Sequence, residues 1–295
     1  MKILDTHLHV WDLETMNLPW LEGMPTVLNR TYTEDDYRLA IKLGSEYQIE
    51  AAVYMEVDAA SDEKEKEYCF LNSWVENKDS IIKGGIISAN LESKDFPRYL
   101  DSHNHSSVKG VRHVLHVSSS LPGTCLKENF VRNIQELGKR GMVFEACMRT
   151  EELDDLYQLA LQCPDTYIIL NHMGNVDTQK IYLMGSDDTS REYGENWLKQ
   201  LRKLATLSNV ICKVSGLNPV GDWDVDRLKP TVDYVLDIFG EDNIVFGGNF
   251  PVCNISMTVL RWIEVLDEIT RSRPETLRKK LFYENAEQIY NIKCN

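Results

Sequence analysis

Two histidines near the start of the chain, His7 and His9, lie two residues apart in a short apolar stretch at 3–9. Side chains on a β-strand alternate between its faces, so both imidazoles are expected on one face, together with Asp5. Two imidazoles at the end of a buried strand are costly unless they share a ligand. The pair therefore predicts a site for a metal ion or for a substrate.

Other ionisable or amide residues interrupt apolar stretches further along the chain, near the end of each stretch. They are Glu56, Arg112, His113, His116, Glu145, Asn171, His172, Lys213, Ser215 and Asn249. Because each of these groups is costly to bury, their repeated occurrence favours one shared polar site. A purely structural interpretation is also open, in which Glu56 pairs with Lys213 and Arg112 pairs with Glu145.

Three of these histidines form a candidate metal site. His7, His9 and His172 supply the ligand set of a three-histidine centre for one divalent ion, with Zn²⁺ the first choice. Such an ion lowers the pKa of a bound water to about 7 and keeps a fourth position open. No fourth, acidic ligand is evident from the sequence. A metal-independent site, in which the same histidines hold the substrate, therefore stays open.

The remaining candidates have two interpretations each. Trp11 and Trp20 are expected either to cap the fold or to stack on a sugar ring. His113 and His116 are either ordinary residues at a strand end or part of the site.

Eight short apolar, β-rich stretches alternate with helical patterns along the chain. The predicted strands are 2–9, 51–57, 81–89, 108–115, 142–148, 167–173, 210–214 and 243–247. The predicted helices are 33–47, 61–77, 93–102, 128–139, 151–162, 195–207, 225–239, 255–269 and 274–290. A longer polar excursion is expected over 175–193. Strands that alternate with helices pair in parallel.

Eight such units predict an α/β fold, a single (β/α)8 TIM-barrel domain over 1–295 that includes extra C-terminal helices. An open, doubly wound sheet usually carries a glycine-rich turn after its first strand, and this sequence has none there. In a barrel, active sites lie at the C-terminal ends of the strands. That is where the interrupting polar residues fall.

The composition limits the classes of partner. A net charge of −14 argues against nucleic acid or an anionic membrane as a partner and leaves a small-molecule substrate. Without an apolar stretch long enough for a membrane span and without a signal peptide, a cytoplasmic protein is expected. A homo-oligomer is compatible with the sequence. Seven cysteines without Cys-x-x-Cys spacing predict buried, reduced thiols, for example at Cys69, Cys147 and Cys212.

With these residues in view, the chain resembles the amidohydrolase superfamily, and within it the amidohydrolase-2, sugar-lactonase-like branch. The matching stretches are 5–12, 110–116, 169–174, 212–217 and 246–253. They are spread over nearly the whole chain. The resemblance implies a slightly distorted (β/α)8 barrel and an activity among hydrolases of sugar-acid or aromatic dicarboxylate lactones, with metal-dependent decarboxylases among the wider relatives.

The sequence departs from the family pattern at two places. The last strand of the family usually carries Gly-Ser-Asp-Trp-Pro, whereas this chain has Asn249 at the position of the catalytic Asp. The sixth strand usually carries Asp-His, whereas this chain has Asn171 before His172. An amide cannot accept a proton from water near neutral pH, although it can orient the water.

We therefore expect a hydrolase acting on a carboxylic ester bond, in a lactone or related cyclic ester of a sugar-like acid. The expected catalytic residues are Asn249, to orient a water, and His172 or Glu145 as its base. The expected substrate-binding residues are Arg112, His113, His116, Lys213, Glu56, Trp11 and Trp20. Among them, Arg112 is expected to bind a carboxylate or polarise the carbonyl, and Lys213 to stabilise the oxyanion. The alternatives are a metal-dependent decarboxylase or non-lactone hydrolase on the same barrel, or a non-catalytic ligand-binding relative.

Overall fold

The computed structural model describes residues 1–42 and 46–293 and contains one eight-stranded sheet, in which neighbouring strands pair in parallel in the order β1 to β8. The strands are β1 Lys2–Leu8, β2 Gln48–Met55, β3 Ile82–Ser88, β4 Val108–Val114, β5 Val143–Cys147, β6 Ile168–Leu170, β7 Val210–Val214 and β8 Ile244–Phe246. The ring closes where His9 N donates to Phe250 O over 2.8 Å, just beyond β1 and β8. The predicted TIM barrel is confirmed.

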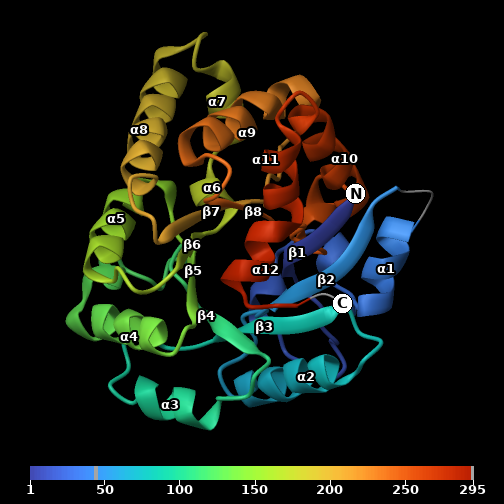
Figure 1. Ribbon diagram of the computed structural model, residues 1–295, viewed down its shortest axis with the longest axis vertical. Coiled ribbons are helices and arrows are strands. Elements are labelled where there is room, and N and C mark those ends of the chain that lie inside the picture. Colours follow the sequence, from blue (N-terminus) through green and yellow to red (C-terminus); the bar gives the residue numbers. More distant parts are fainter. Residues whose placement is uncertain (43–45, 294–295) are drawn as a thin grey trace.

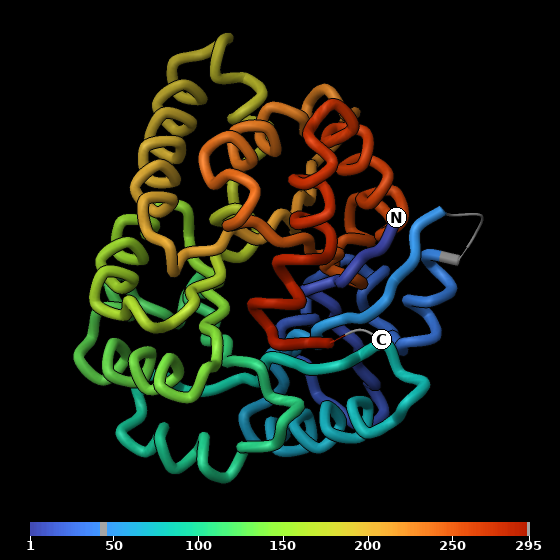
Figure 2. The backbone as a smooth tube through the Cα atoms, viewed as in Figure 1, coloured from blue at the N-terminus to red at the C-terminus, as the bar shows by residue number. Residues whose placement is uncertain are grey.

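Helices surround the strands in chain order (Figure 1). They are α1 Glu34–Lys42, α2 Lys64–Glu76, α3 Phe96–Ser102, α4 Glu128–Lys139, α5 Leu153–Gln162, α6 His172–Asn175, α7 Thr178–Leu183, α8 Asp188–Leu204, α9 Val225–Phe239, α10 Val259–Thr270, α11 Glu275–Lys279 and α12 Asn285–Ile289. The tube in Figure 2 passes once around the ring, from blue β1 to the red C-terminal segment. Part of the helix predicted over 33–47 lies outside the described residues.

The barrel interior is a separate apolar core. It is formed by inward side chains such as Leu4, Val53 and Ile169, and it includes Ala286 and Tyr290 from the C-terminal segment. In Figure 1 α12 lies across the centre of the ring of strands. The extra C-terminal helices therefore close the N-terminal end of the barrel and leave the opposite end for a site.

The strand β1 is irregular at the point where it reaches the site. Its pairing with β2 shifts register between Asp5 and Leu8, so simple alternation of faces fails there. The Asp5 carboxylate does not share the face of His7, because it accepts hydrogen bonds from Tyr37 OH on α1 over 2.7 Å and from Gly248 N over 2.7 Å. Asp5 thus joins β1 to the segment after β8.

The excursion after β6 is more helical than the sequence suggests. The segment predicted as a polar loop over 175–193 contains α7 and the first turns of α8. Both helices begin at an aspartate that caps backbone N–H groups: Asp177 accepts from Gln179 N and Asp187 accepts from Ser190 N. Capping by a single carboxylate is a weak signal in a polar stretch.

The described cysteines are free thiols. Cys147 and Cys212 are buried, as expected, but Cys69 is exposed on α2 because it lies on the outer face of that helix. Among the described helices, none is long and apolar enough to span a membrane.

Candidate active site

Three imidazoles meet at the C-terminal ends of the strands. The ring centroid of His7, at the end of β1, lies 4.9 Å from that of His9 and 4.6 Å from that of His172, which follows β6. Burial, and after it the neighbouring positive charges, lower the pKa of His7 and His172 well below the usual value. Burial and the charge of Arg112 lower the pKa of His9 to about 3. All three rings are therefore neutral near pH 7.

In two of the three rings, Nδ1 is fixed by a hydrogen bond to a neighbouring group. His9 Nδ1 lies 3.0 Å from Met55 O, so it carries the proton and leaves a lone pair on Nε2. His172 Nδ1 lies 2.8 Å from Ser215 Oγ. Such contacts typically orient histidines that bind a metal.

His7 is different, because both of its ring nitrogens are buried and have no hydrogen-bond partner in the described chain. Unpartnered buried nitrogens indicate a missing ligand or water. Three neutral imidazoles fit Zn²⁺ in donor type and charge state. As placed, however, no three His, Cys, Asp or Glu side chains in residues 1–42 and 46–293 converge in metal-binding geometry. The donor chemistry therefore fits a divalent ion, whereas the placement of the three rings in this structure does not form its coordination geometry.

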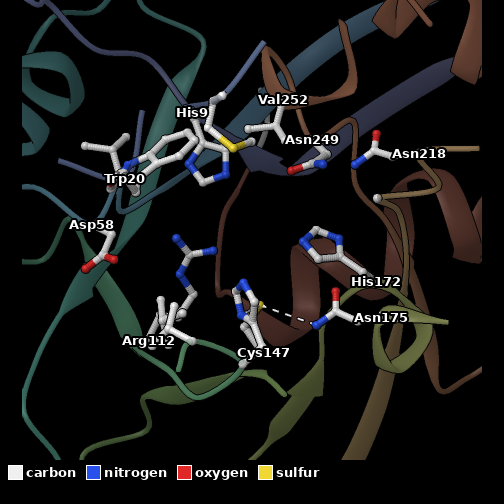
Figure 3. Close-up of a pocket in the computed structure, with 16 residues that line it drawn as sticks. His9, Trp20, Asp58, Arg112, Cys147, His172, Asn175, Asn218, Asn249 and Val252 are labelled. Atoms are coloured by element: carbon white, nitrogen blue, oxygen red, sulfur yellow. Dashed lines mark hydrogen bonds between the residues drawn. The ribbon is translucent and has the colours of Figure 1, made fainter. Parts of the chain in front are cut away.

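Arg112 and Glu56 form a buried ion pair beside the histidines. Arg112 Nε donates to the Glu56 carboxylate, and Nη2 donates to Glu56 O over 2.8 Å. Neither bond uses Nη1. Figure 3 shows the guanidinium pointing toward the middle of the pocket, with His9, His172 and Asn249 around it. The pair fixes the Arg112 fork while it keeps one edge of the guanidinium available to a ligand.

A second buried ion pair lies beneath the pocket. Lys213 Nζ donates to Glu145 Oε2 and to Thr6 O, both over 2.8 Å, and both charged side chains are fully buried. Asn171 and Tyr290 also donate to the Glu145 carboxylate. Neither Lys213 nor Glu145 lines the pocket. The expected structural pairs, Glu56 with Lys213 and Arg112 with Glu145, are wrong: partners are exchanged because Lys213 on β7 reaches across the barrel floor.

The polar groups surround a cavity of about 360 Å³, within the range of roughly 300–1,000 Å³ usual for small-molecule sites. Its walls include His9, His172, Arg112, His116, Asn249, Trp20, Cys147, Asn175, Asn218 and Asp58. Trp20 is fixed by a hydrogen bond from its Nε1 to Val57 O over 2.7 Å. Its indole is therefore held in place at the pocket wall.

Asn249 reaches the pocket from the segment after β8. Its backbone has φ 55° and its N–H donates to His7 O over 2.8 Å. Asparagine tolerates this left-handed conformation better than most residues. The hydrogen bond from Gly248 N to the Asp5 carboxylate holds the same segment, so Asn249 sits beside the histidines, as expected from the sequence.

Trp11 and His113 also lie outside this pocket. Trp11 is buried, donates from Nε1 to Arg30 O over 2.7 Å and packs edge-on against Trp20. Its position supports the interpretation as a structural residue. His113 points to the outer side of β4, where its Nδ1 accepts from Leu91 N, and it lines a neighbouring cavity. It differs from Arg112 because adjacent residues on a strand face opposite ways.

The structure also adds residues that the sequence did not single out for chemistry: Cys147, Asn175 and Asp58. For Cys147 a signal existed, because it lies two residues after Glu145 on β5 and so shares its inward face. Asp58 follows β2 in a loop, and Asn175 ends the short α6 after β6. At such positions residue type alone says little.

Neutral histidines and an arginine lie at the C-terminal ends of the barrel strands, around a small cavity. This arrangement is typical of a (β/α)8-barrel enzyme with a polar active site. The family model described as "Amidohydrolase" matches residues 4–292. The chain belongs to the amidohydrolase family. The resemblance seen in the sequence and the expectation of a hydrolase are therefore confirmed.

Individual relatives are more distant. An L-fucono-1,5-lactonase of Burkholderia multivorans is 24% identical over 88% of each chain. The structure of amidohydrolase 2 from Bifidobacterium longum subsp. infantis is 28% identical, with a TM-score of 0.75 over 99% of this chain and all of that one. An amidohydrolase from Burkholderia multivorans, solved with bound zinc, is 22% identical with a TM-score of 0.84 over 99% and 100% of the two chains.

Proposed function

We propose that this protein hydrolyses the lactone of a sugar-like acid by attack at the ring carbonyl. The observation that carries the proposal is the position of Arg112, whose guanidinium is fixed by Glu56 and faces a small cavity shared with neutral histidines. A fixed cation in a buried site stabilises an oxyanion far better than a mobile one in water. The similarity to an L-fucono-1,5-lactonase supports this choice of substrate class.

The residues that line the pocket would have different roles in binding and catalysis. Arg112 Nη1 would bind the substrate carbonyl oxygen or an adjacent oxygen, and Trp20 would stack on the apolar face of the ring. His116 and the amide of Asn249 would bind hydroxyl groups or orient a water, as donors and acceptors of hydrogen bonds. In the metal-free alternative, His172 would accept a proton from that water, because its ring is neutral, lines the pocket and is then not a metal ligand.

Three buried charged residues would position other groups without contacting the substrate. Lys213 and Glu145 lie beneath the pocket, so their proposed role is to position β5, β6 and β7 rather than to touch the substrate. Glu56 would position Arg112. We therefore assign these three as positioning residues.

A divalent ion, Zn²⁺ first, would be held by His7, His9 and His172. When bound, such an ion supplies a Lewis acid and a more acidic water. The proposal is supported by the unpartnered nitrogens of His7 and by the zinc bound to a structural neighbour. The alternative is that the histidines bind substrate directly.

The test is a panel of L-fucono-1,5-lactone, other five- and six-membered aldonolactones and simple lactones, followed by proton release and by NMR of the ring-opened acid. Hydroxybenzoates, followed by release of CO₂, test the decarboxylase alternative. Turnover of a sugar-acid lactone supports the proposal. Turnover only of the hydroxybenzoates, or thermal stabilisation by lactones without turnover, would refute it.

A further inference from the structure

A cysteine and a histidine form a hydrogen-bonded pair in the wall of the same pocket. Cys147 Sγ lies 3.3 Å from His116 Nδ1, and both side chains line the cavity that holds Arg112 and His172. Cys147 is the last residue of β5, and His116 follows the adjacent strand β4, whose Val114 is paired with Cys147 in the sheet. The sheet register therefore brings the pair together.

Polar neighbours favour the charged form of this pair. The carboxamide nitrogen of Asn175 lies 3.9 Å from Cys147 Sγ (dashed line in Figure 3). Burial alone raises the pKa of the Cys147 thiol, yet the hydrogen bond and charge of His116, the charge of Arg112 and the Asn175 contact lower it below the usual value. The contact with Cys147 in turn raises the pKa of His116.

The other buried thiols behave in the opposite way. Burial raises the pKa of Cys125 and Cys163 to about 12, and it raises the pKa of Cys212 and Cys253 further. Low thiol pKa values occur where a histidine or another cation faces the sulfur, and they identify reactive cysteines. Cys147 therefore differs from these buried cysteines in its neighbours, not in its burial.

We propose that Cys147 is a catalytic nucleophile, with His116 as its proton-transfer partner, and that hydrolysis proceeds through a thioester. This inference rests on the proposed lactone hydrolysis. It also accounts for Asn249, since an amide cannot accept the proton of an attacking water and a thiolate attacks without such a base.

The steps balance without another reactant. The Cys147 thiolate attacks the lactone carbonyl and forms a C–S bond, the ring C–O bond breaks, and the leaving alkoxide takes the proton of the His116 imidazolium. Water then attacks the thioester and gives its proton to His116, which restores the thiolate and imidazolium as the hydroxy acid leaves. Arg112 faces the oxyanion in both steps.

The experiment compares wild type, Cys147→Ser, Cys147→Ala and His116→Gln on the lactone that the wild type turns over best. The control is Cys69→Ala, since Cys69 is exposed on α2 and away from the pocket. Acid-quenched wild type is expected to carry an adduct with the full mass of the lactone on the Cys147 peptide, which hydroxylamine releases as the hydroxamate. Both Cys147 variants are expected to lose at least 100-fold in kcat while the melting temperature stays near that of the wild type.

Two further readouts need no variant of Cys147. Iodoacetamide is expected to alkylate Cys147 with a pH midpoint below that of free cysteine in solution, and His116→Gln is expected to shift the Cys147 midpoint upward. Lactone turnover by Cys147→Ala within threefold of the wild type would overturn the nucleophile and leave the proposed function standing. No turnover of any lactone by the wild type would overturn both.

Discussion

The imidazoles of His7 and His172 lie with ring centroids 4.6 Å apart, although one residue ends the first strand and the other follows the sixth. The backbone N–H of Asn249 donates a hydrogen bond to His7 O. Three distant stretches of sequence therefore meet at one point. This juxtaposition defines the active-site cup on which the proposed function depends.

Replacing Asn249 by Asp is expected to raise kcat for lactone hydrolysis at pH 7 by about tenfold or more, because a carboxylate at this position can accept a proton from water. The measurement is proton release under saturating lactone. Asn77→Asp, at the exposed end of α2, is the matched control and is expected to leave kcat unchanged. A variant slower than wild type would argue against a water beside Asn249.

Removing His7 tests the metal site without an activity assay. Protein stripped with a chelator is expected to bind one equivalent of Zn²⁺ in calorimetry, and His7→Ala is expected to weaken that binding at least tenfold. His105→Ala, outside the pocket, serves as the control. Equal Zn²⁺ affinity in His7→Ala and wild type would show that the imidazoles bind something else.

The buried pair beneath the pocket predicts a large and asymmetric effect on stability. Lys213→Met leaves the fully buried Glu145 carboxylate without its cation and is expected to lower the free energy of unfolding by about 3–5 kcal/mol. The double variant with Glu145→Gln is expected to recover a large part of that loss. Urea unfolding measures both, and additive losses would contradict the pairing.

Glu67 on α2 predicts a pH dependence of stability. It is buried and accepts hydrogen bonds from Tyr54 OH over 2.7 Å and Val57 N over 2.6 Å. Burial, and after it the charge of Glu56, raise the pKa of Glu67 to about 7 from 4.5.

The folded chain therefore holds a proton that the unfolded chain has lost between about pH 4.5 and 7. The Glu67 contribution to stability is full below pH 4.5 and disappears as the pH rises through 7, with a slope of up to about 1.4 kcal/mol per pH unit. Glu67→Gln is expected to remove this slope, and Glu76→Gln, at the exposed end of the helix, to keep it. Denaturant midpoints from pH 4.5 to 8 provide the comparison, and identical profiles for Glu67→Gln and wild type would refute the assignment.

Most of the fold and much of the cup follow from the sequence, because both depend on local periodicity. Apolar stretches alternating with helices identify the barrel, and polar residues at strand ends such as Arg112 and His172 identify its open face. What failed depends on geometry between elements. The shift in β1 after Asp5, which puts Asp5 and His7 on different faces, is set by strand register. The exchange of ion-pair partners between Glu56 and Glu145 is set by side-chain reach across the barrel. Residue types alone do not predict register or side-chain reach. The neighbours of the Cys147 thiol also depend on how adjacent strands pair, so the sequence did not predict them.

The most direct test of the central claim is the initial rate of lactone hydrolysis by the wild type and by Arg112→Met, each shown to be folded by its melting curve. The wild type is expected to hydrolyse at least one sugar-acid lactone at least 1,000-fold faster than buffer, on the order of what a preorganised oxyanion site provides, and Arg112→Met is expected to lose at least 100-fold of that rate. A wild type no faster than buffer on every lactone, or an Arg112→Met variant as fast as wild type, would contradict the account.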